Sequence, residues 1–167
     1  MSESLWLLDF WFVQQALIIK VNGYILFLIS GLIISSIVEK STPVERLSNG
    51  NPIAIIVLLF ILPTAILCIL IIKDFLKLLD NLNTKQVLIV LITLIFIVSL
   101  LFIGEYAVIQ KTLDRLGGVP FEPESLIYNK GWFNIYTFAI YVNRFSFLIS
   151  IFICLIACCV IKLHNRK

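Results

Sequence analysis

The stretch QVLIVLITLIFIVSLLFIG, residues 86–104, contains no Asp, Glu, Lys, Arg or His. A helix needs roughly 20 mostly apolar residues to cross about 30 Å of hydrocarbon. Three further stretches, each bounded on both sides by a charged residue, share this property: 21–38, 47–72 and 145–161. The sequence therefore predicts an all-α integral membrane protein with four transmembrane helices in a single membrane domain.

The composition indicates the same class of protein. The chain is 60% hydrophobic and 14% charged, whereas globular domains have about 45–50% and about 25%. Its thirteen Lys and Arg are scattered and the net charge is only +3, so the chain lacks the continuous basic face that would attract nucleic acid. We expect the lipid bilayer as a partner and no direct nucleic-acid binding.

Charged residues define the expected boundaries and orientation. We expect an N-terminal segment at 1–20 and a basic tail at 162–167. The four spans are expected at 21–38, 52–72, 86–104 and 132–161, with main connections at 73–85 and 105–131. Lysines close to span ends are enriched on the side that also holds both termini, and such lysines face the cytoplasm. This predicts an N-in, C-in topology in the bacterial inner (cytoplasmic) membrane.

The first twenty residues fit two geometries. Residues 5–19 are apolar apart from Asp9, Gln14 and Gln15, and they include aromatic residues typical of the headgroup region. They either form an interfacial helix that turns into the first span near Asn22 and Gly23, or belong to one helix from about Leu5 to Val38. We favour the interfacial helix, although the polar positions do not gather on one face.

Two features inside the spans concern packing. Gly31 and Ser35 form a small-xxx-small pair, which lets another helix approach closely, within the fold or between copies of a homo-oligomer. Pro63 lies in the middle of the second span and predicts a helix kink there, as a structural feature rather than a gating hinge.

The connection at 73–85 is amphipathic, with apolar residues at helical spacing, so the second span is expected to continue into the cytoplasm. Its charged residues are candidates for docking a cytoplasmic protein partner: Lys73, Lys77, Asp80 and Lys85. The alternative is a solvated connection that only joins two helices. Asn83, followed by Gln86 three residues later, resembles a helix N-cap.

On the other side of the membrane, residues 105–116 continue at helical spacing and Gly117 and Gly118 end the helix. Two prolines then hold Phe121, Glu122 and Glu124 in an extended or turn conformation. A loop this long is usually functional or disordered. We expect these three residues to recognise an external ligand.

Arg144 is the only charged residue between Gly131 and Ile161. It lies at the outer boundary, level with Glu105, if the lipid-spanning core is 145–161, and deeper if the helix starts at Trp132. It is then a snorkelling arginine, or the partner of Glu105 in an ion pair that fixes the third and fourth spans. The third alternative is a conducting or proton-relay role, against which the first three spans contribute no charge at mid-depth.

The sequence contains no recognisable catalytic motif. All four cysteines lie within expected spans, without a Cys-x-x-Cys pair: Cys68, Cys154, Cys158 and Cys159. His164 is the single histidine, and there is no Ser, His, Asp set and no glycine-rich phosphate loop. We expect a non-enzymatic protein without a cofactor or a metal.

The full-length architecture resembles two protein families. Four spans, both ends inside, a long outer loop before the last span and a short basic tail resemble the membrane subunits (KwaA) of Kiwa anti-phage defence systems. They also resemble immunity proteins against pore-forming colicins of the colicin A type. The first resemblance implies a homo-oligomeric inner-membrane sensor that recruits a cytoplasmic effector, and the second implies capture of a toxin within the bilayer. No motif carries over functional residues.

A small channel or transporter subunit is the third alternative. Transporters normally have charged or broken helices at mid-membrane in more than one span. In this chain Pro63 and Arg144 are the only such charged or helix-breaking residues in the interior of the expected spans. This favours an interaction protein over a transporter.

Overall fold

The computed structural model describes residues 3–41, 53–134 and 136–166, without the side chains of 3–13, 16, 17, 41, 53–64 and 67. The chain is all-helical, with 78% of its residues in helix and no strand in these ranges. Five helices follow in order: α1 Glu3–Ser41, α2 Ile53–Asp80, α3 Thr84–Leu116, α4 Phe138–Tyr141 and α5 Arg144–His164.

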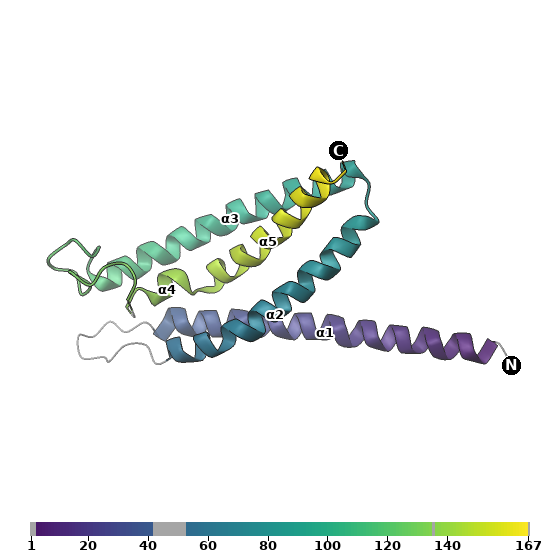
Figure 1. Ribbon diagram of the computed structural model, residues 1–167. Helices are drawn as coiled ribbons and strands as arrows, with labels where there is room; N and C mark the ends of the chain where they lie inside the picture. Colours follow the sequence, from purple (N-terminus) through teal and green to yellow (C-terminus); the bar gives the residue numbers. More distant parts are fainter. Residues whose placement is uncertain (1–2, 42–52, 135, 167) are drawn as a thin grey trace.

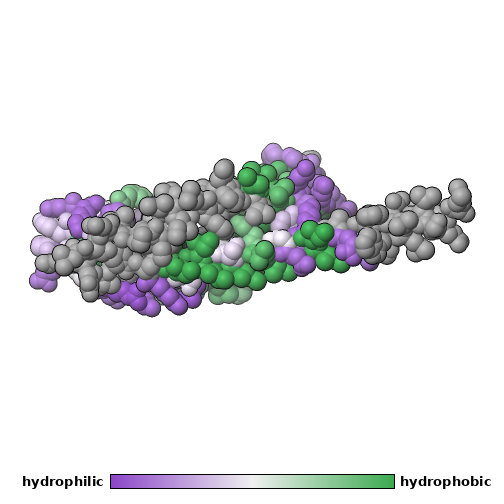
Figure 2. Space-filling view, turned by 90° about the horizontal axis from the view of Figure 1, so that it is seen from below, coloured by the Kyte–Doolittle hydropathy of each residue, from purple (hydrophilic) through white to green (hydrophobic). Residues whose placement is uncertain are grey.

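Three segments in the described part of the chain are long and apolar enough to cross a membrane: Ile18–Lys40, Thr84–Leu116 and Phe138–His164. Their outward-facing side chains are large and apolar, for example Ile33 on α1 and Ile92 and Phe96 on α3. Figure 2 shows hydrophobic residues over the middle of the molecule and hydrophilic residues toward both ends of the coloured surface. The all-helical architecture and these apolar surfaces support a membrane protein.

Helix α5 lies at the centre of the bundle (Figure 1). It packs most extensively against α3, and it also contacts α1 and α2. The N-terminal part of α1 continues beyond the other helices, whereas the C-terminus of the chain lies beside the α2–α3 turn (Figure 1). The ends of α5 therefore lie against different neighbours, and these two regions hold the polar residues described below.

Helix α1 is one continuous helix of 39 residues. The expected turn near Asn22 and Gly23 is wrong, and the alternative of a single long helix is correct. No proline lies between Glu3 and Ser41, and an isolated glycine costs a helix only about 1 kcal/mol relative to alanine. A helix in lipid also pairs its backbone groups internally, which a turn at this point would prevent.

Helix α2 continues to Asp80, as the amphipathic pattern predicts, and a short turn leads into α3. The expected cap at Asn83 is confirmed: the Gln86 N–H donates to Asn83 Oδ1 at 2.9 Å, and the Asn83 N–H donates to Gln86 Oε1 at 2.9 Å. The helix assignment of α2 runs through position 63. The Pro63 side chain lies outside the described residues, so the kink stays a prediction.

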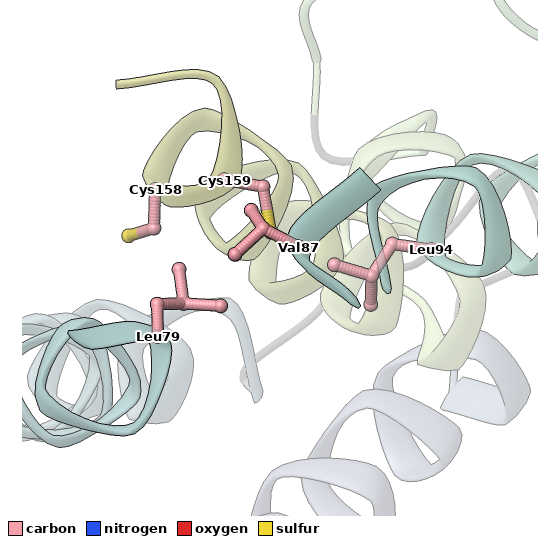
Figure 3. Close-up of a cluster of buried hydrophobic side chains, with 5 residues drawn as sticks. All are labelled: Leu79, Val87, Leu94, Cys158 and Cys159. Carbon is pink, nitrogen blue, oxygen red and sulfur yellow. The ribbon is translucent and has the colours of Figure 1, made fainter. Parts of the chain in front are cut away.

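The two ends of the bundle are named after the expected topology. The inner end holds the C-terminus of the chain and the α2–α3 turn, and the outer end holds the connection from α3 to α5 (Figure 1). The inner end has an apolar core (Figure 3). Leu79 of α2, Val87 and Leu94 of α3, and Cys158 and Cys159 of α5 are buried together. The two cysteines are free thiols. Because they pack as small apolar side chains in this core, they join α5 to the α2–α3 hairpin.

Helix α3 ends where the sequence predicts. Gly117 adopts the left-handed conformation with φ 74°, and its N–H bonds to the last turn of α3. Helix α5, in contrast, begins at Arg144, so the expected start of the fourth span at residue 132 is wrong. The Asn134 side chain accepts from the Tyr136 and Thr137 N–H groups. Asn134 thereby holds this stretch in a turn, because short polar side chains compete with helical hydrogen bonds.

Two glycines accept two phenylalanine rings of α5. A Cβ atom at Gly31 of α1 would lie 2.3 Å from Phe147 Cζ, and one at Gly104 of α3 would lie 2.2 Å from Phe145 Cε1. Ser35 is buried beside Gly31, and its hydroxyl donates to the Gly31 carbonyl at 2.7 Å. The Gly31 and Ser35 face is thus a packing face within the fold. A homo-oligomer would have to use another surface.

Candidate functional site: two polar regions at the ends of the bundle

The charge-free segments have nearly equal lengths. In α1, α3 and α5 they comprise residues 21–38, 86–104 and 145–161, which span about 26–29 Å at 1.5 Å per residue. This is close to the roughly 30 Å hydrocarbon core of a bilayer. Most of the charged residues that end these segments contact polar side chains of a neighbouring helix or its cap, and they lie in two polar regions.

The outer polar cluster consists of Glu39 of α1, Glu105 of α3, and Asn143, Arg144 and Ser146 at the start of α5. Asn143 is the N-cap of α5: its Oδ1 accepts from the Phe145 N–H at 2.8 Å and the Ser146 N–H at 3.1 Å. Its Nδ2 donates to Glu105 Oε1 at 3.0 Å. A single asparagine therefore starts α5 and connects it to α3.

The expected Glu105–Arg144 ion pair is not formed, and this prediction is wrong. Arg144 Nε instead lies 3.7 Å from Glu39 Oε2, and the Arg144 guanidinium lies over the Phe145 ring, 5.1 Å from its centroid. Asn143, the residue before Arg144, takes the place beside Glu105. Two consecutive residues of α5 thus reach carboxylates on two different helices.

Glu105 is buried, Glu39 is partly buried, and both carboxylates are incompletely hydrogen-bonded. Glu105 is 9% exposed and the Glu39 side chain is 15% exposed. Glu105 Oε2 and Glu39 Oε2 each lack a hydrogen-bond partner. The positive end of the α5 dipole favours negative charge at this position, yet buried polar atoms without partners are rare and usually have a functional or structural cause.

The inner polar region contains two ion pairs. Lys20 of α1 pairs with Asp74 of α2, and the Tyr24 hydroxyl donates to Asp74 Oδ2 at 2.5 Å. The hydrogen bonds from Lys20 and then Tyr24 hold the pKa of Asp74 below its usual value of 3.8. Lys162 of α5 pairs with Asp80. These contacts attach the inner ends of α1 and α5 to α2.

Only part of the expected docking residues at 73–85 is available to a partner. Leu79 is fully buried and its apolar neighbours pack on the inner core, while Asp80 is engaged by Lys162. Lys73, Lys77 and Lys85 are exposed. A partner would therefore meet a surface of lysines, because the apolar side of this segment is used within the chain.

The outer loop after α3 is folded onto the end of that helix. The Leu126 N–H donates to the Leu116 carbonyl at 2.8 Å, and Ile127 is fully buried. Glu122 Oε2 accepts from the Val119 N–H at 3.0 Å, so Glu122 helps to shape the loop. Phe121, which is 78% exposed, and Glu124, also exposed, are the expected recognition residues that face outward.

Sequence reasoning missed Glu39, Asn143 and the Lys20–Asp74 pair. A local signal existed for Asn143, because an asparagine followed by a serine three residues later directly precedes an apolar run. Glu39 is the first charged residue after an apolar run, as Glu105 is. Nothing in the sequence states which of the two carboxylates faces Arg144.

Comparison of the chain with protein-family models, curated proteins and solved structures finds no match. Among the described residues, no group of three or more His, Cys, Asp or Glu side chains is placed to hold a metal ion.

Proposed function

We propose that this chain is a four-span protein of the bacterial inner membrane with both termini in the cytoplasm, and that α2 provides the fourth span. The charge-free run 47–72, most of which lies in α2, is long enough to cross the bilayer. The Lys162–Asp80 pair supports this topology, as does the hydrogen bond from Arg166 Nη2 to the Leu79 carbonyl at 2.8 Å. These contacts hold the C-terminal end of α5 beside the α2–α3 turn.

The topology is tested with reporter fusions. A reporter fused after Lys167 and one inserted at Asn81 should both read as cytoplasmic, and one inserted at Gly118 should read as external. Any other pattern contradicts the four-span arrangement with both ends inside.

The proposed function is that of a non-enzymatic sensor or anchor subunit, in a homo-oligomer, of an anti-phage defence complex that recruits a cytoplasmic protein partner. One observation carries the proposal. Helix α5 begins in the outer polar cluster and ends against the α2–α3 hairpin, so a change at the outer surface has a continuous route to exposed inner lysines. The resemblance in architecture to Kiwa membrane subunits is consistent with this role.

The partner site is tested by reversing its charge. Lys73→Glu, Lys77→Glu and Lys85→Glu, combined in one variant, should abolish co-purification with the product of an adjacent gene and abolish protection against phage. A matched control, Lys111→Glu on the exposed outer end of α3, should keep both. Equal binding by both variants would contradict recruitment through this surface.

Immunity against a pore-forming toxin is the second candidate function. It is favoured by the lipid-side surface of α3, where Ile89, Ile92, Phe96, Leu100 and Ile103 are exposed, because a toxin helix could pack on these side chains within the bilayer. Cells that express the chain would then survive a colicin of the A type. They would not survive it if the defence role alone is correct.

A further inference from the structure

The outer polar cluster contains more negative than positive charge. Glu39 and Glu105 are two carboxylates, whereas Arg144 provides the only positive charge that contacts either of them among the described residues. Both carboxylates contact the start of α5, Glu39 through Arg144 and Glu105 through Asn143, so their negative charges repel each other. Charged side chains at the edge of the hydrocarbon are expensive unless they are paired, so one negative charge of the cluster is left uncompensated.

The contacts distinguish the two carboxyl groups. Glu39 faces the Arg144 guanidinium, with Nε 3.7 Å from Oε2. Glu105 has only neutral partners, the Asn143 amide and the Ser146 backbone N–H, and its Oε2 is buried without a hydrogen bond. Glu105 is therefore the group whose negative charge is less well stabilised.

No other charged group in the described part of the chain compensates Glu105. The titratable group of α4, the Tyr141 hydroxyl, donates to the Trp132 carbonyl at 3.2 Å. Lys40 of α1 and Tyr106 of α3, the neighbours of the two carboxylates in sequence, are exposed. The groups that face Glu105 are thus Glu39 from α1, and Asn143 and the Ser146 N–H from the start of α5, whereas Arg144 faces Glu39.

We propose that the outer polar cluster is a proton-binding site in which Glu105 holds one proton while Glu39 stays ionised against Arg144. Protonation removes the uncompensated charge. A proton fits this site better than a metal ion does, because the cluster offers two carboxyl groups and a metal ion would lie beside the Arg144 guanidinium. The proposal is independent of the antiviral role.

The site couples proton binding to helix packing. Loss of the proton places a second negative charge beside Glu39 and repels α3 from α1. Both helices contact α5 in this region, Glu105 through Asn143 and Glu39 through Arg144. An ionised Glu105 therefore loosens the junction of α1, α3 and α5 at the outer surface.

Infrared spectroscopy of the full chain in lipid nanodiscs tests the site. At neutral pH the wild type should show the C=O stretching band of a buried protonated carboxyl group, and Glu105→Gln should remove that band. Glu124→Gln, in the exposed loop, is the matched control and should leave it unchanged. Absence of the band from the wild type, or its persistence in Glu105→Gln, overturns the proposal.

Two further measurements keep the test decisive if Glu105→Gln folds poorly. In Glu39→Gln the neighbouring negative charge is gone, so the band should remain and should titrate at lower pH than in the wild type. The melting temperature of the wild type should fall as the pH rises through the range where the band disappears, and should level off above it. A band that titrates at the same pH in Glu39→Gln and the wild type contradicts the carboxyl pair.

Discussion

The two ends of the bundle use the same kinds of residue under different conditions. At the inner end, Lys20 with Asp74 and Lys162 with Asp80 join helices through ion pairs that water reaches. At the outer end, Glu105 is buried and Glu39 is partly buried, and the hydrogen bond to Glu105 comes from a neutral amide. Exposed ion pairs contribute little to stability, whereas a buried charge without its partner costs much more. The outer end is therefore the sensitive one.

Glycine substitution should give the largest difference between the packed and the open parts of the bundle. Gly31→Leu and Gly104→Leu force a side chain into the Phe147 and Phe145 rings, and we expect each to lower the free energy of unfolding by about 3 kcal/mol. Gly23→Leu, toward the inner end of α1 where a Cβ meets nothing within 4 Å, should be neutral or stabilising. Thermal unfolding in detergent measures all three. Equal losses would contradict the described packing.

The two helix caps provide the next comparison. Asn83→Ala at the exposed inner cap should cost about 1 kcal/mol, a typical value for a lost N-cap. Asn143→Ala removes the same kind of cap and also the hydrogen bond to buried Glu105, so we expect about 2–3 kcal/mol. Denaturant titration of both variants in the same detergent checks this ratio. A cost for Asn143→Ala no greater than that for Asn83→Ala would show that the Glu105 contact contributes nothing.

Double-mutant cycles compare the described and the expected partner of Arg144 at the outer end. Glu39→Gln with Arg144→Met should show a coupling energy of about 0.6–1.7 kcal/mol, the range measured for polar contacts between membrane helices. Glu105→Gln with Arg144→Met should show a clearly smaller coupling, because these two side chains are not paired. If the second cycle gives the larger value, the original Glu105–Arg144 prediction is correct and the described partners are wrong.

The smallest effect concerns pH at the inner end. The pKa of Asp74 is lowered by Lys20 and Tyr24, so its contribution to stability is present above the ordinary carboxyl pKa and is lost as the pH falls through the lower folded value. Tyr24→Phe should therefore lower the melting temperature slightly near neutral pH. The difference from wild type should vanish once the pH lies below the lowered folded pKa of Asp74. If the melting-temperature difference between Tyr24→Phe and the wild type persists in acid, its cause is the packing of Tyr24 and not the hydrogen bond to Asp74.

Local signals in the sequence predict much of the fold. The Asn83 cap, the end of α3 at Gly117 and the charge-free segments each depend on neighbouring residues in the chain, and the structure agrees with them. The start of α5 is harder to predict. Asn134 and Asn143 each accept hydrogen bonds from backbone N–H groups nearby in the chain, whereas the aromatic residues around them are equally compatible with a longer helix. The continuity of α1 is also hidden, since Asn22 and Gly23 are compatible with either a helix or a turn.

The candidate site is harder to predict than the fold, for a geometric reason. Span boundaries assign each charged residue a depth in the membrane, and Glu39, Glu105 and Arg144 share one depth. The direction in which a side chain points around its helix depends on how the helices are rotated against each other. That rotation is determined by contacts such as those of Phe145 and Phe147, whose glycine partners lie far away in the sequence.

These two aromatic contacts limit how α5 can move. Phe145 and Phe147 are two positions apart, so their directions around the helix axis differ by about 200°, and their rings lie on α3 and α1 respectively. Rotating α5, or sliding it along its axis, would require both rings to leave their glycines together. The inner end has no ring-and-glycine contact of this kind. There the core cluster around Cys158 and Cys159 and the water-exposed Lys162–Asp80 pair hold α5. A signal that crosses this bundle would travel as a tilt of α5 about its outer end, with the largest displacement beside the α2–α3 turn.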